Sequence, residues 1–153
     1  MATSKNKVDI TRVLDAPRAL VFEAWSRAEH LVKWFAPDGF ECHCSMDFRV
    51  GGTLAIRFVG HGMDSVANGV YHEIVEPERI VMGMRFPDVP EYELRTTVTL
   101  AARGDQTEIR VEQVFPPQDA LTPAQRELLG PRMAGAPIGW NQTLDHLAQF
   151  VRR

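Results

Sequence analysis

Residues 39–52 read GFECHCSMDFRVGG, and apolar side chains occupy every second position of this stretch. Successive side chains of a β-strand point to opposite faces, so the alternation predicts a strand over residues 40–49. One face of this strand carries Phe40, Cys42, Cys44, Met46 and Phe48. The other face carries charged, histidine and hydroxyl side chains. The pattern therefore predicts an amphipathic strand with one buried, apolar face.

The Cys42-His43-Cys44 sequence raises the question of a zinc or redox site, because the chain has no other cysteine. Strand alternation turns His43 away from both thiols, and a tetrahedral zinc site needs about four converging ligands. Alternate residues of a strand lie about 6.6 Å apart, which would strain a disulfide. We therefore expect two reduced, buried cysteines and predict neither a metal site nor a cofactor.

The same period of two continues through most of the chain, with turn residues at intervals. A first strand ends at Asp15, and further strands are predicted over residues 53–59, 66–75, 79–86, 92–100 and 107–115. The connections between them are short, which antiparallel hairpins require. The sequence thus predicts an antiparallel sheet.

Helical patterns occur near both ends of the chain. Asp15 is a candidate N-cap, and Pro17 suits the first turn of a helix whose apolar face includes Trp25. A second short helix is predicted over residues 29–34. Near the C-terminus, a helix of about four turns is predicted from Pro137, with a stripe formed by Trp140, Leu144, Leu147 and Val151. Between sheet and final helix, three proline-bounded pieces predict only a short helix over residues 123–129.

Each predicted strand has one apolar and one polar face, so the apolar side of the sheet must be covered. The C-terminal helix is the only predicted helix long enough for this task. We therefore expect an α+β fold in which a curved antiparallel sheet wraps around one long C-terminal helix, with two short helices after the first strand. The length of 153 residues suits one domain over residues 1–153.

Composition restricts the partners. The formal net charge is -3, with basic and acidic residues well mixed, so no basic patch favours nucleic acid. No apolar run approaches the ~18 residues of a membrane span. The N-terminus lacks the pattern of a secretory signal, and two cysteines without framework spacing indicate a reducing compartment. We expect a cytoplasmic protein; the oligomeric state stays open, and a homodimer is one option.

Five segments carry a family resemblance. They read DAPRALVFEAW (15–25), HLVKWFAPDGF (30–40), MDFRVGG (46–52), GVYHEIVEPERIV (69–81) and GWNQTLDHLAQFV (139–151). In this order they resemble the activator of Hsp90 ATPase homologue family of the START-like, or SRPBCC, superfamily. The resemblance covers residues 8–151, with one departure at Phe35, where relatives often carry tryptophan. It implies a helix-grip fold with a cavity between the sheet and the last helix.

The family name comes from a eukaryotic co-chaperone that has a further N-terminal domain. This chain has no room for such a domain, so we expect no appreciable stimulation of Hsp90 ATPase. Fold membership alone says little about activity.

Under the helix-grip expectation, the inward faces of the strands and of the last helix would line the cavity. The expected lining is Phe40, Cys42, Cys44, Met46, Phe58, Met82, Met84, Phe86, Val98 and Trp140, with Trp25 or Trp34 at the mouth. Two inward polar residues, Arg12 and Gln113, are candidates for ligand contact. The alternative is that the same residues close on one another as an ordinary core, with Arg12 and Gln113 in satisfied hydrogen bonds.

Catalytic residues cannot be assigned from this sequence. The five histidines are dispersed and form no HExxH motif or recognisable nucleophile–base pair. Tyr71 and Glu73 share a strand face with Gly69, but alternation leaves open whether that face is inside. The first hypothesis is a module that binds a small apolar or aromatic molecule. The second is an enzyme of cyclase, dehydratase or hydrolase type, as in polyketide cyclases of the superfamily, and the third is a chaperone cofactor.

Overall fold

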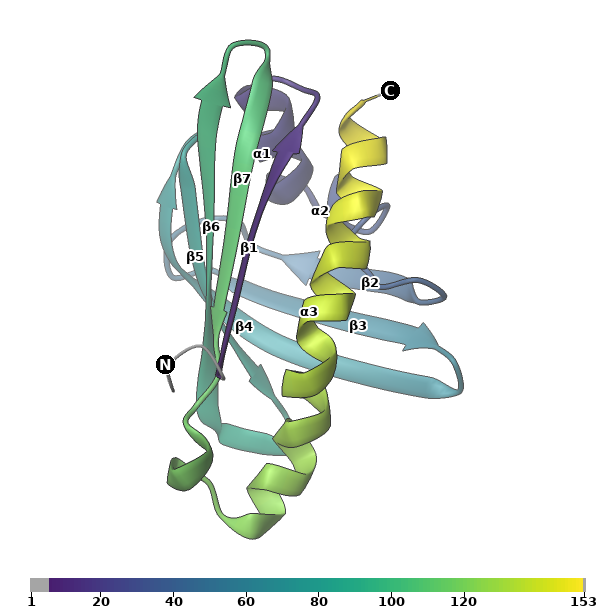
Figure 1. Ribbon diagram of the computed structural model, residues 1–153, viewed down its shortest axis with the longest axis vertical. Coiled ribbons are helices and arrows are strands. Elements are labelled where there is room, and N and C mark those ends of the chain that lie inside the picture. Colours follow the sequence, from purple (N-terminus) through teal and green to yellow (C-terminus); the bar gives the residue numbers. More distant parts are fainter. Residues whose placement is uncertain (1–5, 153) are drawn as a thin grey trace.

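In the computed structural model, which describes residues 6–152, seven strands form one antiparallel sheet in the order β1-β7-β6-β5-β4-β3-β2. Their bounds are β1 (Lys7–Leu14), β2 (Glu41–Met46), β3 (Thr53–Gly60), β4 (Met63–Val75), β5 (Arg79–Phe86), β6 (Val89–Arg103) and β7 (Gln106–Val114). Every strand predicted from the alternation is present. The sheet is strongly curled: β1 and β5–β7 run along the long helix, while β2–β4 cross behind it (Figure 1).

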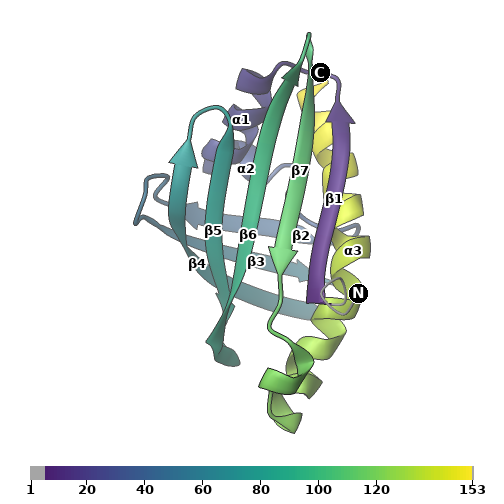
Figure 2. The same cartoon turned by 60° about the vertical axis from the view of Figure 1, so that its left-hand side comes forward.

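Two short helices, α1 (Arg18–Ser26) and α2 (Ala28–Leu31), follow β1 as predicted. They lie near the C-terminal end of α3 (Pro123–Val151) and close that end of the curled sheet (Figure 2). The predicted cap is wrong, because Pro17 itself occupies the N-cap position and no side chain caps α1. The second helix is also shorter than predicted, since residues beyond Leu31 form turns.

The C-terminal helix differs most from the prediction. A single helix, α3, runs over 29 residues and contains Pro131 and Pro137 inside it, where the sequence had indicated breaks. Each proline removes one backbone donor and costs about 3 kcal/mol in a helix interior. Packing of α3 along the sheet offsets this cost, and a capping box between Thr122 and Gln125 fixes its start. A short 3-10 helix, η2 (Gln118–Ala120), precedes it.

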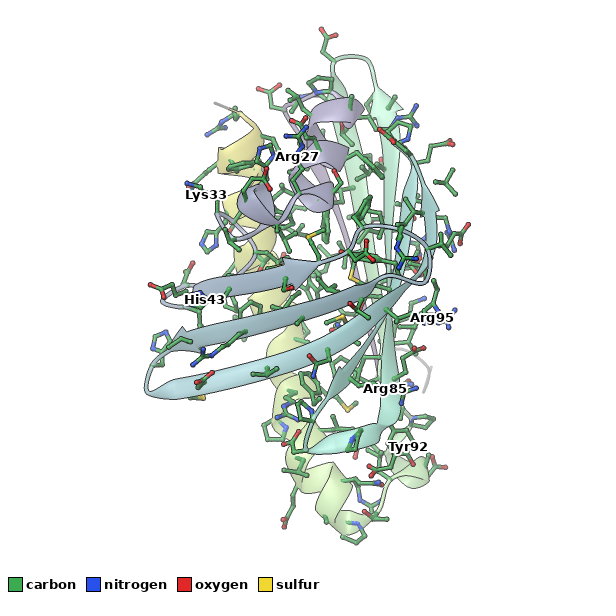
Figure 3. All side chains as sticks on the ribbon, turned by 180° about the vertical axis from the view of Figure 1, so that it is seen from behind. Arg27, Lys33, His43, Arg85, Tyr92 and Arg95 are labelled. Atoms are coloured by element: carbon green, nitrogen blue, oxygen red, sulfur yellow. The ribbon has the colours of Figure 1, made fainter. Side chains whose placement is uncertain are left out.

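The core lies between the inner face of the sheet and the predicted apolar stripe of α3. Leu144 and Leu147 are fully buried and Val151 nearly so, which confirms the stripe. On β2 the burial alternates as predicted, with outward Glu41, His43 and Ser45 exposed. Seen from behind, charged side chains such as Arg85 and Arg95 project from the outer face of the sheet (Figure 3). The sheet therefore has one wet face and one face packed on α3.

Tyr71 lies on the inner face of the sheet, and a β-bulge in β4 places Glu73 on the outer face. The register with β5 shifts between Tyr71 and Glu73, so these two residues do not share a face as strict alternation predicted. Tyr71 is 2% exposed in the core, whereas Glu73 accepts a hydrogen bond of 3.0 Å from the Arg79 guanidinium on the outer side.

Within residues 6–152, no helix combines the length and apolar character of a membrane span.

Candidate functional site

A cleft of about 390 Å³ lies between α3 and the inner face of the sheet. It receives side chains from β3–β7, from the segment after α2 and from residues 131–143 of α3. Its lining comprises Phe35, Pro37, Ile56, Phe58, Met63, Ser65, Ala67, Met82, Met84, Phe86, Leu94, Thr96, Gln113, Phe115, Pro131, Arg132, Gly135, Ala136, Gly139, Trp140 and Thr143. Most of these side chains are apolar, so the cleft offers a largely hydrophobic surface.

An aromatic cluster sets where the cleft begins. Trp25 and Trp34 pack edge to face with ring centroids 4.8 Å apart, and both contact Phe35. Trp140 stacks on Trp25 at 6.4 Å and meets Phe35 edge to face at 5.6 Å. These rings fill the space on the concave side of the sheet next to α1 and α2. Trp140 and Phe35 therefore form the end wall of the cleft, and the hollow extends along α3 towards its N-terminal half.

Small residues of α3 leave the hollow unfilled. Gly135, Ala136 and Gly139 line the cleft without bulky side chains. A Cβ built on Gly135 would meet nothing within 4 Å, and one on Gly139 would meet only the Pro37 Cγ at 3.6 Å. The cleft thus exists because this segment of α3 lacks side chains long enough to reach the sheet.

Strand β5 supplies the opposite wall. Met82, Met84 and Phe86 alternate along its inner face, as the period of two predicts. A Cβ on Gly69 of the neighbouring strand would clash with the Met84 Sδ and with the Gly83 carbonyl oxygen. Only a glycine there lets the Met84 side chain lie across β4. Because methionine is flexible and polarizable, this wall can adapt to ligands of irregular shape.

One hydrogen-bonded chain of polar groups crosses the wall formed by β6 and β7. The Trp140 Nε1–H donates to the Gln113 Oε1 at 3.2 Å, and the Gln113 Nε2 donates to the Thr96 Oγ1 at 3.1 Å. Thr96 is 1% exposed and Thr143, on α3, is 5% exposed. These groups give an otherwise apolar cleft a polar side.

Arg132 is the one ionisable side chain of the cleft lining within the described residues. Its guanidinium donates two hydrogen bonds to the Asp88 carboxylate, at 2.9 and 3.0 Å, and lies 4.1 Å above the Phe86 ring. The hydrogen bonds from Arg132 lower the pKa of Asp88 below its ordinary value. The charge of Arg132 is therefore already paired.

The structure brings five of the predicted lining residues and one of the two predicted polar contacts, Gln113, to the cleft. The five lining residues are Phe58, Met82, Met84, Phe86 and Trp140. The expected contribution of β2 is absent, because Cys42, Cys44 and Met46 pack in the core with the aromatic cluster, as does the fully buried Val98. Phe40 is not part of the lining; its ring contacts His61 and the lining residue Phe58. Trp25 and Trp34 are buried in this cluster and are not at the mouth.

Arg12, the other predicted polar contact, lies away from the cleft lining. Its guanidinium donates to the Asn141 backbone carbonyl at 3.0 Å and to the Asp145 carboxylate at 2.8 Å. The side chain thus ties β1 to α3, which corresponds to the satisfied hydrogen bonds of the alternative hypothesis.

Sequence reasoning missed Thr96, Thr143 and Arg132 for different reasons. Alternation already places Thr96 between Leu94 and Val98 on the inner face of β6, so that signal was available. Thr143 lies on α3 next to Leu144 of the predicted stripe and was not among the predicted site residues. Arg132 lies in the proline-containing segment that was not predicted to be helical beyond residue 129. The sequence therefore did not indicate on which side of a helix its side chain lies.

Histidine pairs occur outside the cleft. His72 on β4 contacts the Glu93 carboxylate at 2.8 Å on the outer face of the sheet. His146 contacts the Ala36 carbonyl oxygen and the Asp38 carboxylate, at 2.8 and 2.7 Å, and so joins α3 to the segment before β2. Among residues 6–152, no group of three or more His, Cys, Asp or Glu is arranged to hold a metal ion.

The cysteines are free, Cys42 buried and Cys44 half-buried. Burial raises the pKa of Cys42 from 9.0 to about 12, with a smaller effect of the neighbouring Cys44. Burial also raises the pKa of Cys44 to about 11. Since the thiolate is the nucleophile, both thiols should be inert at neutral pH.

We expect iodoacetamide at pH 8 to modify Cys44 about 100-fold, and Cys42 about 1,000-fold, more slowly in the folded protein than in urea, following the thiolate fractions. The pKa values are raised on folding, so the free energy of unfolding should fall as the pH rises above 9, where the unfolded thiols ionise first. Mass spectrometry of timed samples measures the rates. Modification of either folded thiol at the unfolded rate would contradict the buried placement.

Residues 15–152 match the family described as "Activator of Hsp90 ATPase homolog 1-like protein". A crystal structure of a protein from Chromobacterium violaceum is similar, with 32% sequence identity, a TM-score of 0.79, and coverage of 97% of this chain and 99% of that chain. Comparison with curated proteins gave no match.

More distant structures share the fold. A crystal structure of a protein from Nitrosomonas europaea is 21% identical, with a TM-score of 0.78 over 97% of this chain and 96% of that one. A solution structure of a protein from Arthrobacter aurescens is 17% identical, with a TM-score of 0.81 over 98% of this chain and 88% of that one. At these identities the likeness concerns the fold alone.

Proposed function

The chain belongs to the activator of Hsp90 ATPase homolog 1-like family of the START-like superfamily, and from this premise we propose that it binds a small hydrophobic or aromatic molecule in the cleft between α3 and the sheet. The observation that carries the proposal is the apolar cleft of about 390 Å³. Ligand sites in proteins typically measure about 300–1,000 Å³ and combine an apolar lining with a few polar groups. The cleft has both properties.

The ionisable groups support binding rather than acid–base catalysis. Arg132 is the one ionisable residue in the lining among residues 6–152, and Asp88 already pairs with it. Tyr71 and Glu73, the residues that a cyclase hypothesis would use, lie in the core and on the outer face respectively. The His72–Glu93 pair also faces outward. General acid–base catalysis needs such a group within hydrogen-bond reach of the substrate.

The free thiols of Cys42 and Cys44 fit a reducing compartment, so the proposed site of action is the cytoplasm.

A neutral fluorescent amine, N-phenyl-1-naphthylamine, tests the proposal. We expect its emission to rise and shift to the blue on addition of the protein, saturating at one molecule per chain. The cleft would remove its aromatic surface from water, which contributes roughly 25 cal/mol per Å². An equimolar amount of urea-unfolded protein serves as control. Emission no higher than with the unfolded chain would contradict a binding function.

A further inference from the structure

The chain of hydrogen bonds on the β6–β7 wall has a fixed direction. An indole Nε1–H can only donate, so the Gln113 atom facing Trp140 at 3.2 Å must be the amide oxygen. The amide nitrogen of Gln113 then faces Thr96, and the Thr96 Oγ1 accepts its hydrogen at 3.1 Å. Each group thus determines the role of the next, from Trp140 through Gln113 to Thr96.

This direction leaves one hydrogen without an acceptor, that of the Thr96 hydroxyl at the end of the series of hydrogen bonds. A hydroxyl that accepts a hydrogen bond still has its own hydrogen to donate. Thr96 is 1% exposed and lines the cleft, and its side chain makes no second hydrogen bond within residues 6–152. Buried polar groups in proteins nearly always have a partner. The Thr96 hydroxyl is therefore a donor that lacks an acceptor in the described protein.

A second hydroxyl lies on the facing helix. Thr143 is 5% exposed, lines the cleft and has no side-chain hydrogen bond in the described part of the chain. Threonine within a helix often satisfies its hydroxyl on the carbonyl one turn earlier. Thr143 does not, so each wall of the cleft contains a lining threonine whose hydroxyl hydrogen has no acceptor within residues 6–152.

The charges in the cleft argue against an ionised ligand. The guanidinium of Arg132 is held by two hydrogen bonds to Asp88 and by its position over Phe86. A ligand carboxylate would have to displace Asp88 or enter the apolar cleft without a counter-ion. Burial of an unpaired charge costs far more than burial of a neutral oxygen that accepts a hydrogen bond.

We infer that the ligand, if the proposed binding function holds, is a neutral apolar molecule that carries a carbonyl-type acceptor, and that this oxygen accepts the hydrogen of the Thr96 hydroxyl. The class covers aromatic or aliphatic ketones, quinones and esters. It excludes pure hydrocarbons and ionised fatty acids as the preferred ligands.

Three matched naphthalenes test this inference. 2-Acetylnaphthalene has the acceptor, 2-isopropenylnaphthalene replaces the carbonyl oxygen by a CH₂ group of similar shape, and 2-naphthoate at pH 7 is an anion. Each is titrated against the folded protein by displacement of N-phenyl-1-naphthylamine. We expect the ketone to bind about fivefold more tightly than the alkene, as one neutral hydrogen bond provides. We expect the anion to bind most weakly of the three.

Two variants connect the preference to Thr96. Thr96→Val replaces the hydroxyl by a methyl group of similar size and should lower the ratio of ketone affinity to alkene affinity to about one, because only the ketone can accept the hydroxyl hydrogen. Thr97→Val is the matched control, because Thr97 is the next residue of β6 and points to the opposite face. It should keep the preference of the unmodified protein. Saturable binding of the alkene by Thr96→Val shows that the variant still forms the cleft.

The outcomes separate the two proposals. Equal binding of ketone and alkene, or an unchanged preference in Thr96→Val, would overturn the acceptor inference and leave the binding function standing. Tightest binding of naphthoate would overturn the exclusion of anions. Binding of none of the three, with no uptake of the fluorescent amine, would overturn both the inference and the proposed function.

Discussion

Trp140→Ala is expected to lower the free energy of unfolding by about 3 kcal/mol, the lower end for truncation of a large aromatic side chain. Trp140 packs against both the main core and the smaller cluster of Val8, Leu94 and Phe115. Its ring also stacks on Trp25 and meets Phe35. The substitution removes these contacts and leaves the Gln113 Oε1 without its donor. Urea unfolding followed by circular dichroism measures the loss.

Trp140→Phe is the matched control. It keeps an aromatic ring but removes the indole N–H that donates to Gln113. We expect a smaller loss, about 1–2 kcal/mol, from one hydrogen bond and a modest change in packing. The difference between the two variants then reports the packing of the ring. If Trp140→Ala left the free energy of unfolding unchanged, the docking of α3 on the sheet through this residue would be wrong.

Gly139→Leu is expected to weaken binding of N-phenyl-1-naphthylamine at least about tenfold, or about 1.4 kcal/mol. Gly139 lines the cleft, and the first carbon of a side chain there would make an ordinary contact with Pro37. The remaining carbons of leucine would occupy the space that we assign to the ligand. Stability should not suffer, because leucine or alanine favours a helix over glycine by about 1 kcal/mol.

Two controls isolate the effect of filling the cleft. Gly139→Ala gives the same gain in helix propensity with only one added carbon, so it should keep most of the affinity. Ala134→Leu places the same leucine side chain at an exposed position of α3 outside the lining, and this variant should bind as the unmodified protein does. Full affinity in a folded Gly139→Leu variant would place the ligand elsewhere.

The sheet could be predicted because its determinants are local. Alternation of apolar residues is sufficient to assign all seven strands and the facing of β2, where Cys42 is inside and His43 outside. The exception is the bulge after Tyr71, which depends on the register with β5 and has no signature in the alternation. The stripe of α3 could likewise be predicted from its period.

The length of α3 and the position of the cleft could not be predicted in the same way. Pro131 and Pro137 disfavour a helix locally, and only contacts with distant strands offset that cost. The cleft depends on which inward residues are covered by α1 and α2. Trp25 of α1 and Trp34, in the turn after α2, pack in the same core as Cys42 and Val98, so these two residues are covered, while Phe58 and Met84 also line the cleft. Tertiary packing therefore decides which inward residues are covered and which line the cleft.

The methionine methyl groups provide the most direct test that the cleft is the binding site. Met63, Met82 and Met84 line it, whereas Met46 and Met133 lie outside the lining. In NMR spectra of a protein labelled with ¹³C at the methionine methyls, 2-acetylnaphthalene should shift the signals of Met63, Met82 and Met84. The reason is that an aromatic ring changes the local magnetic field at nearby nuclei. The signals of Met46 and Met133 should stay in place. Shifts confined to Met46 or Met133, or no shift at saturating ligand, would contradict the account.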